Sequence, residues 1–111
     1  MLTRAKLDRA LGAVPTPKEL VEFMVTLAKP PKERCLVLEP ACGDCPFLEA
    51  FAERYGHNHE FVGIDIDPEA VYRAKAKLPF ANILEGDFLL WQPHERFDIV
   101  IGNPPYGIIG D

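Results

Sequence analysis

Residues 35–45 read Cys-Leu-Val-Leu-Glu-Pro-Ala-Cys-Gly-Asp-Cys, and this stretch predicts the class of fold. The continuous apolar run at 35–38 is typical of a strand that is buried on both faces of a sheet. After the turn that follows it, residues 47–55 place apolar side chains on one helical face, and a glycine ends that helix. A second apolar strand over 61–66 comes next. Strand, turn, helix and strand in this order indicate a unit with two parallel strands.

A further helix precedes this unit. Thr16-Pro17-Lys18-Glu19 predicts its start, with Thr16 as the N-cap, proline in the first helical position and Glu19 completing a capping box. Apolar residues between 20 and 28 recur at helical spacing, so we expect them to form the face that packs against the core. Pro30-Pro31 ends the helix.

The pattern continues after the second strand. Asp67-Pro68 is expected to cap a third helix that runs to about Lys77. Strands are expected near 82–85 and over 97–101. The fold class is therefore predicted as α/β, a partial Rossmann-like sheet of about four strands with flanking helices.

Composition excludes several classes of protein. The chain has 111 residues, 48% of them hydrophobic and 26% charged, as soluble globular domains do. It contains no serine, which excludes serine-nucleophile chemistry. Neither a membrane span of ~20 apolar residues nor a signal-peptide core is found, so a cytoplasmic location is expected. The net charge of -5 argues against a free-standing nucleic-acid-binding protein, whose surface is normally basic.

Polar residues follow each predicted strand, at the edge where parallel sheets bind ligands. The four segments are 39–45, 65–67, 86–88 and 102–106. Carboxylates, a tight loop and an amide that converge on such an edge are typical of a nucleoside pocket. Asp65 lies 20 residues after Cys45, the interval at which nucleotide-binding units place the acid that binds ribose hydroxyls.

The tetrapeptide Asn103-Pro104-Pro105-Tyr106 carries the most specific chemistry, although it is also compatible with a simple turn after a strand. The exocyclic amine of a nucleobase is a poor nucleophile because its lone pair is delocalised into the ring. Acceptors aimed at its protons, the Asn103 side-chain oxygen and the Pro104 carbonyl, would shift the nitrogen toward a tetrahedral, more nucleophilic form. Pro105 would hold that carbonyl outward, and Tyr106 would stack on the base.

Taken together, the motifs resemble those of the adenine-N6 DNA methyltransferases of restriction–modification systems. The motifs are Glu39-Pro40-Ala41-Cys42-Gly43, Gly63-Ile64-Asp65-Ile66-Asp67-Pro68 and Asn103-Pro104-Pro105-Tyr106, in an order and spacing closest to the TaqI-type enzymes. The resemblance runs from Thr16 to the end of the chain. It implies S-adenosylmethionine as the cofactor and methyl transfer to the N6 amine of adenine in DNA as the reaction.

The resemblance also implies a role for each matching residue. Asn103-Pro104-Pro105-Tyr106 would receive a target adenine flipped out of the duplex. Thr16 would bind the methionine carboxylate of the cofactor, Asp65 its ribose hydroxyls and Asp87 its adenine amine. The implied cofactor-binding residues in full are Thr16, Glu39, Pro40, Ala41, Cys42, Asp65, Ile66, Asp87, Phe88 and Pro105. No metal site is implied.

The sequence departs from the family pattern at three places. Cys45 stands where the family has a second glycine, and Asp65 is a shorter acid than the glutamate common in the relatives. The chain ends five residues after Tyr106, before the remaining strands and the basic DNA-reading domain of the relatives. We therefore expect residues 1–111 to be one truncated catalytic domain that on its own only binds the cofactor. Binding to DNA would require an additional recognition domain. The exposed edge of the fourth strand predicts a homo-oligomer or pairing with a complementing C-terminal half.

Two alternative functions remain open. Cys42 and Cys45, together with His57 and His59, have the residue types of a Cys₂His₂ metal-binding module. A fragment of a Rossmann dehydrogenase is disfavoured because the chain has no Gly-x-Gly-x-x-Gly. Asp67 is expected to be a helix cap rather than a ligand.

Overall fold

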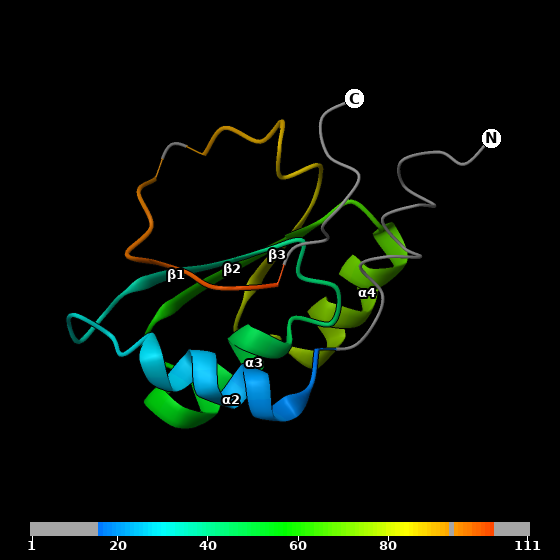
Figure 1. The fold of residues 1–111 in the computed structure, drawn as a ribbon. Helices are drawn as coiled ribbons and strands as arrows, with labels where there is room; N and C mark the ends of the chain where they lie inside the picture. The colour runs from blue at the N-terminus through cyan, green and yellow to red at the C-terminus, as the bar shows by residue number, and fades with distance from the viewer. Residues whose placement is uncertain (1–15, 94, 104–111) are drawn as a thin grey trace.

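Four parallel strands form one sheet in the order β3-β2-β1-β4 (Figure 1). The structure is a computed structural model that describes residues 16–93 and 95–103. The strands are β1 Leu36–Pro40, β2 Glu60–Asp65, β3 Asn82–Glu85 and β4 Ile99–Val100. β1 lies between β2 and β4, with Val37 opposite both Phe61 and Ile99. The predicted α/β class and the four-stranded Rossmann-like sheet are confirmed.

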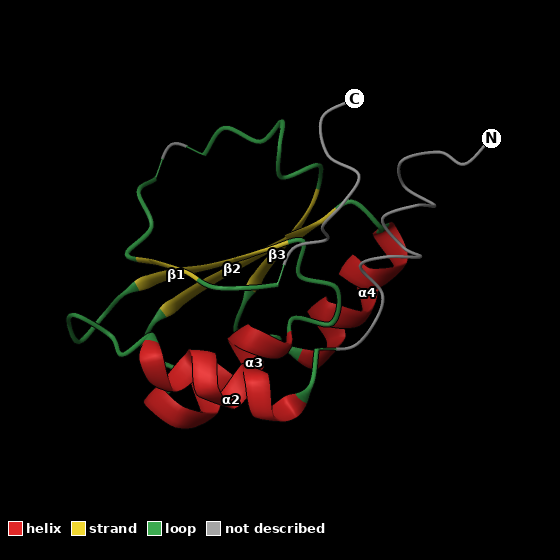
Figure 2. Cartoon of the chain, in the orientation of Figure 1, coloured by secondary structure: helices red, strands yellow, loops and turns green. Residues whose placement is uncertain are grey.

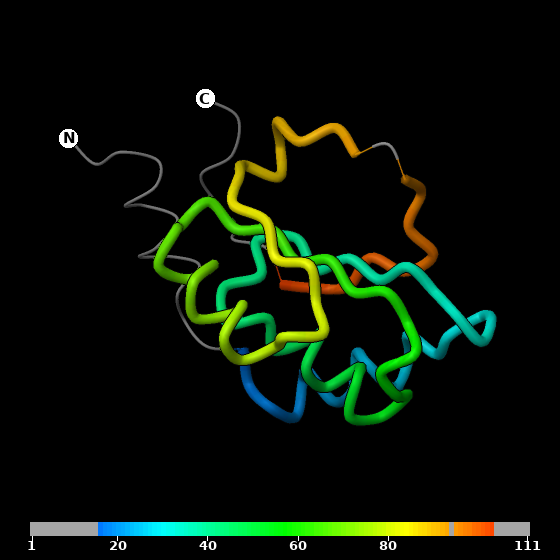
Figure 3. The backbone as a smooth tube through the Cα atoms, turned by 180° about the vertical axis from the view of Figure 1, so that it is seen from behind, coloured from blue at the N-terminus to red at the C-terminus, as the bar shows by residue number. Residues whose placement is uncertain are grey.

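In the part of the chain that the structure describes, three helices cover one face of this sheet (Figure 2). They are α2 Lys18–Leu27, α3 Pro46–Tyr55 and α4 Pro68–Lys77. Successive right-handed crossovers that step in one direction along a parallel sheet place their helices on the same face, which accounts for α3 and α4. The segment between β3 and β4 runs over the opposite face, as the view from behind shows (Figure 3). Among the described residues, no helix is long and apolar enough to cross a membrane.

The core lies between the sheet and the helices. The aromatic rings of Phe51 and Phe61 meet edge to face with centroids 5.9 Å apart, which joins α3 to β2. The hydroxyl of Tyr55 donates a hydrogen bond to the carbonyl of Val25 at 2.9 Å, which connects α3 to α2. The most deeply buried large side chains are Phe47, Phe51, Leu48, Ile64, Val25, Val37, Cys35 and Cys45.

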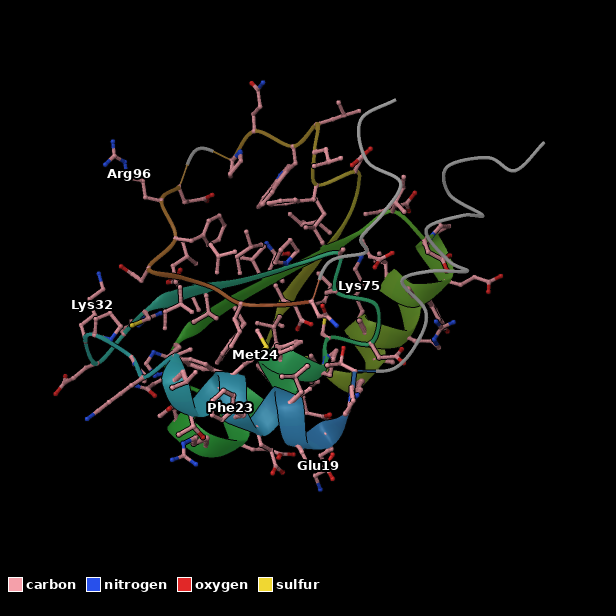
Figure 4. All side chains as sticks on the ribbon, viewed as in Figure 1. Glu19, Phe23, Met24, Lys32, Lys75 and Arg96 are labelled. Carbon is pink, nitrogen blue, oxygen red and sulfur yellow. The ribbon has the colours of Figure 1, made fainter. Side chains whose placement is uncertain are left out.

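The structure corrects two predictions about α2. The helix begins at Lys18 after Pro17, which occupies the N-cap position without a side-chain hydrogen bond, so the predicted Thr16 cap is wrong. The predicted buried face is only partly right, because Val21 and Val25 are buried whereas Phe23 is 61% exposed (Figure 4). Val21 and Val25, which lie four residues apart, face the core, and Met24 packs partly against it. The other large apolar residues of the run lie on the far side of the helix. The exposed apolar residues of α2 are Leu20, Phe23 and Leu27.

Asp98 helps to hold the start of β4 against β1. The Asp98 carboxylate accepts a hydrogen bond from the backbone N–H of Leu36 at 2.8 Å, and the Asp98 N–H donates to the Leu36 carbonyl at 2.9 Å. Lys32 lies 3.2 Å from the same carboxylate. The backbone hydrogen bond, assisted by Lys32, lowers the pKa of Asp98. This attachment fixes the position of the chain as it enters β4.

Candidate functional site

The loop between β1 and α3 has a strained backbone. Ala41, Gly43 and Cys45 all have positive φ, at 49°, 55° and 54°. For residues other than glycine this left-handed conformation costs roughly 1–2 kcal/mol. Cys45, which stands where the resembled family has a glycine, therefore has a backbone conformation that favours glycine, and the chain accommodates a side chain there.

Hydrogen bonds from the neighbouring strand hold this loop. The N–H of Cys42 donates to the carbonyl of Ile64 at 2.9 Å, and the N–H of Gly43 donates to the Asp65 carboxylate at 2.7 Å. The other oxygen of Asp65 accepts from the N–H of Asp67 at 2.8 Å. Asp65, the residue predicted to bind ribose hydroxyls, therefore fixes the loop beside it. The residue is half-buried.

Gly63 of β2 makes room for the loop. A Cβ at this position would lie 2.9 Å from Cys45 Sγ, closer than real Cβ atoms approach, and a tight 3.1 Å from Cys42 Sγ. Both thiols are buried and free. The neighbouring Cys42 side chain and burial raise the pKa of Cys45, so the thiol stays protonated. Sequence reasoning missed this contact because it joins residues that are about 20 positions apart.

The histidines of the predicted metal-binding alternative are occupied elsewhere. His59 is buried and its Nδ1 accepts a hydrogen bond from the N–H of Cys35 at 2.9 Å. His57 packs its ring against Phe80 with centroids 4.4 Å apart. Within residues 16–93 and 95–103, no three His, Cys, Asp or Glu side chains gather in a way that could hold a metal ion. The alternative module of Cys42, Cys45, His57 and His59 is therefore not formed by the described part of the chain.

Glu39 occupies an internal position rather than an open one. Its side chain is 2% exposed, and Oε1 accepts a hydrogen bond from the N–H of Leu48 in the first turn of α3 at 2.9 Å. Glu39 thus caps α3 from the end of β1, because the first N–H groups of a helix have no partner within it. Burial raises the pKa of Glu39 well above its ordinary value, although the N–H groups of Leu48 and Phe47 oppose the shift. This predicted cofactor-binding residue therefore binds the first turn of α3 within the protein.

The ends of β2 and β3 present acids beside apolar side chains. Asp87 is half-buried, and its Oδ1 accepts from the N–H of Leu89 at 2.9 Å. Ile66 is 38% exposed and Phe88 is 37% exposed. The N–H of Gly86 donates to the carbonyl of Asp65 at 2.9 Å, which fixes the two strand ends together. Asp67 caps α4 by accepting from the N–H of Glu69 at 3.1 Å, as predicted.

The end of β4 meets the start of α2. Asn103 Nδ2 lies 3.4 Å from Thr16 Oγ1, so these two predicted site residues, 87 positions apart, are neighbours. Gly102 packs on the end of β1, where a Cβ would lie 3.4 Å from the carbonyl oxygen of Pro40. Pro104, Pro105 and Tyr106 of the predicted catalytic motif lie outside the described residues. The structure thus brings Thr16, Asp65, Asp87 and Asn103 to the same edge of the sheet, each at the end of a different element.

Comparison with known proteins agrees with this arrangement. The model of a family described as "Methyltransferase domain" matches residues 37–107. A type II methyltransferase, M.TthHB8I of Thermus thermophilus, is 53% identical over 103 residues, which are 93% of this chain and 23% of that protein. The chain therefore spans about a quarter of this curated relative.

Two solved structures have a similar fold. The methyltransferase subunit of a type I restriction–modification system from Streptococcus thermophilus superposes with a TM-score of 0.72 at 18% identity, over 83% of this chain and 23% of that one. An RNA methyltransferase from Salinibacter ruber, solved with S-adenosyl-L-homocysteine, gives a TM-score of 0.61 at 28% identity, over 70% and 53% of the two chains. Since the family model matches well over half of the residues, this chain belongs to the methyltransferase domain family.

Proposed function

We propose that this chain forms the S-adenosylmethionine-binding part of an enzyme that methylates the N6 amine of adenine in DNA. The observation that carries the proposal is the convergence of Thr16, Asp65, Asp87 and Asn103 on the edge of the sheet formed by the carboxyl ends of its strands. Open parallel sheets bind nucleotide ligands at this edge. A type II methyltransferase that is 53% identical supports a methyl-transfer reaction, and an RNA methyltransferase of similar fold, solved with S-adenosyl-L-homocysteine, supports the cofactor.

The available groups fit the parts of the cofactor. Asp65 and Asp87 are half-buried acceptors, suited to ribose hydroxyls and to an adenine amine. Ile66 and Phe88 are each more than a third exposed and offer apolar surface for the adenine ring. Thr16 has a half-buried hydroxyl just before α2, suited to a carboxylate. Glu39 does not fit as a direct ligand because it is buried and already bonded to α3.

The proposed reaction requires little acid–base chemistry from the chain. S-adenosylmethionine supplies a methyl group on a positively charged sulfur, which leaves as a neutral thioether. The Asn103 side-chain oxygen and the Pro104 carbonyl accept hydrogen bonds from the adenine amine and localise its lone pair on nitrogen. As the new C–N bond forms, the electrons of the S–C bond go to sulfur, and the amine loses one proton to solvent. The role of the chain is therefore to position the adenine amine against the methyl group and to polarise that amine.

We expect DNA binding to require basic surface beyond that of residues 1–111. Its net charge is -5, and protein–DNA affinity comes largely from lysine and arginine contacts with phosphates. The type II relative is about four times longer than the matched part. We propose that the remainder of such a protein supplies the basic surface that reads the DNA sequence.

Calorimetric titration with S-adenosyl-L-homocysteine tests the proposal. We expect saturable binding, weakened about tenfold by Asp65→Asn or by Asp87→Asn, because each change removes a charged acceptor. Glu53→Gln, an exposed acid on α3, serves as the matched control and should leave the affinity unchanged. Circular dichroism establishes that each variant is folded. No heat at millimolar ligand from the folded chain would contradict the proposal.

A further inference from the structure

The contact between Thr16 and Asn103 joins the proposed cofactor site to the proposed methyl-acceptor site. Asn103 Nδ2 points to Thr16 Oγ1 at 3.4 Å. In this arrangement the amide nitrogen faces Thr16, and the amide oxygen points away from that hydroxyl. The proposed reaction needs that oxygen, because only an acceptor can bind the protons of an amine.

Both partners of the contact are fixed by the surrounding fold. Asn103 follows Ile101, which is buried and whose N–H donates to the carbonyl of Leu38 at 2.9 Å. Thr16 precedes Pro17, whose carbonyl accepts from the N–H groups of Leu20 and Val21 in the first turn of α2. Ile101 and the α2 residue Val21 belong to the same buried core, so the juxtaposition of the two side chains follows from the way both segments are attached to that core.

A threonine hydroxyl alone does not determine which way an amide faces, because the hydroxyl both donates and accepts. Its single proton resolves this ambiguity. If that proton is donated to a carboxylate, the hydroxyl oxygen can only accept, and the amide must then present its N–H₂ group to Thr16. A cofactor carboxylate bound by Thr16 would thus turn the oxygen of Asn103 outward.

We propose that Thr16 is a positioning residue that orients the Asn103 amide when the cofactor binds. This inference rests on the proposed function, since it assigns the hydroxyl proton to the methionine carboxylate. The distance of 3.4 Å is long for an N–H···O hydrogen bond, whose usual value is ~2.9 Å. Site hydrogen bonds are often long before the ligand is present and shorten in the complex. The proposal therefore implies that cofactor binding strengthens the contact.

Nuclear magnetic resonance of the Asn103 side-chain amide tests the proposal. In the ligand-free chain, we expect Thr16→Val to shift the Asn103 N–H₂ resonances, while Thr16→Ser, which keeps the hydroxyl, leaves them nearly unchanged. The matched control is Thr26→Val within α2, where the Thr26 hydroxyl donates to the carbonyl of Glu22 at 2.8 Å. Asn103 resonances that are identical in wild type and Thr16→Val would overturn the contact itself.

Titration with S-adenosyl-L-homocysteine tests the coupling. We expect the ligand to move the Asn103 amide resonances in wild type and in Thr16→Ser, and not in Thr16→Val at saturating ligand. Thr16→Val should also weaken binding about tenfold, with recovery in Thr16→Ser. An equal response in all three proteins would overturn the proposal. Absence of ligand binding to wild type would instead contradict the proposed function, and the ligand-free comparison would still decide whether the contact exists.

Discussion

Gly63 shows how a single residue determines the shape of the candidate site. The loop after β1 can lie across the end of β2 only because Gly63 leaves space for the sulfurs of Cys42 and Cys45. The loop amide of Gly43 then reaches the Asp65 carboxylate. A side chain at position 63 would push the loop away from that carboxylate.

We therefore expect Gly63→Ala to destabilise the fold by about 1–3 kcal/mol, the usual cost of overpacking a filled core. Gly86→Ala is the matched control, since a Cβ there would meet Ile64 Cδ1 at an ordinary 3.5 Å. Urea denaturation of both variants measures the free energies of unfolding. Equal costs for the two substitutions would show that the loop does not depend on the space at Gly63.

Glu39 should make the stability of the protein depend on pH. Its folded-state pKa is raised by burial, so the folded state holds its proton over a range in which the unfolded chain has lost it. The contribution of Glu39 to the free energy of unfolding is therefore most favourable below the pKa of ~4.3 that it has in the unfolded chain. This contribution is lost as pH rises through the higher pKa of the folded state.

Glu39→Gln removes the ionisation while keeping an oxygen that can accept from Leu48. We expect the variant to gain stability relative to wild type as pH rises from about 4 to 8. Urea denaturation at several pH values measures the difference in free energy of unfolding. A difference that stays constant across this range would show that burial does not control the Glu39 carboxyl.

At the scale of elements, α2 has a buried side and an exposed side. Val25 is 1% exposed and Phe23 is 61% exposed, although both lie in the same apolar run. We expect Val25→Ala to cost about 2 kcal/mol, because it leaves a cavity in the core, and Phe23→Ala to cost less than about 0.5 kcal/mol. Thermal and urea unfolding of the two variants measure these costs. Similar losses would show that the exposed side of α2 is packed in solution.

The sequence predicted the strands better than it predicted this helix face. Residues 35–38 and 61–66 were recognisable as strands because a strand buried on both faces needs a short unbroken apolar run. In α2 the apolar residues are too numerous to define one side, and only contact with α3 selects Val21 and Val25. The Thr16 cap was predicted wrongly because the capping motif is local, whereas the helix starts after Pro17.

The candidate site could be predicted only in part for a similar reason. Asp65, Asp87 and Asn103 stand at strand ends, and the order of strands in a parallel sheet places such residues together. Three other features depend on how the elements approach one another. They are the burial of Glu39, the space beside Gly63 that the two cysteine sulfurs fill, and the contact of Asn103 with Thr16. Local sequence patterns do not predict the distances between elements.

At the scale of the whole molecule, β4 forms an edge of the described sheet. It pairs with β1, and Val100 is 59% exposed. Strand edges with apolar side chains favour pairing with another chain. We expect the isolated chain to associate at micromolar concentration and Val100→Lys to shift it toward monomer. Light scattering measures the mass, and a monodisperse 12.4 kDa species in wild type would contradict this expectation.

The central claim is that the carboxyl edge of this sheet binds the cofactor. Amide chemical shifts of the labelled chain, followed during titration with S-adenosyl-L-homocysteine, test it most directly. We predict saturable shifts at Gly43, Ile66 and Phe88, and no shifts at Asn58 and Glu60, which lie at the opposite edge where β2 begins. Shifts confined to that opposite edge, or no shifts at millimolar ligand in a folded sample, would contradict the account.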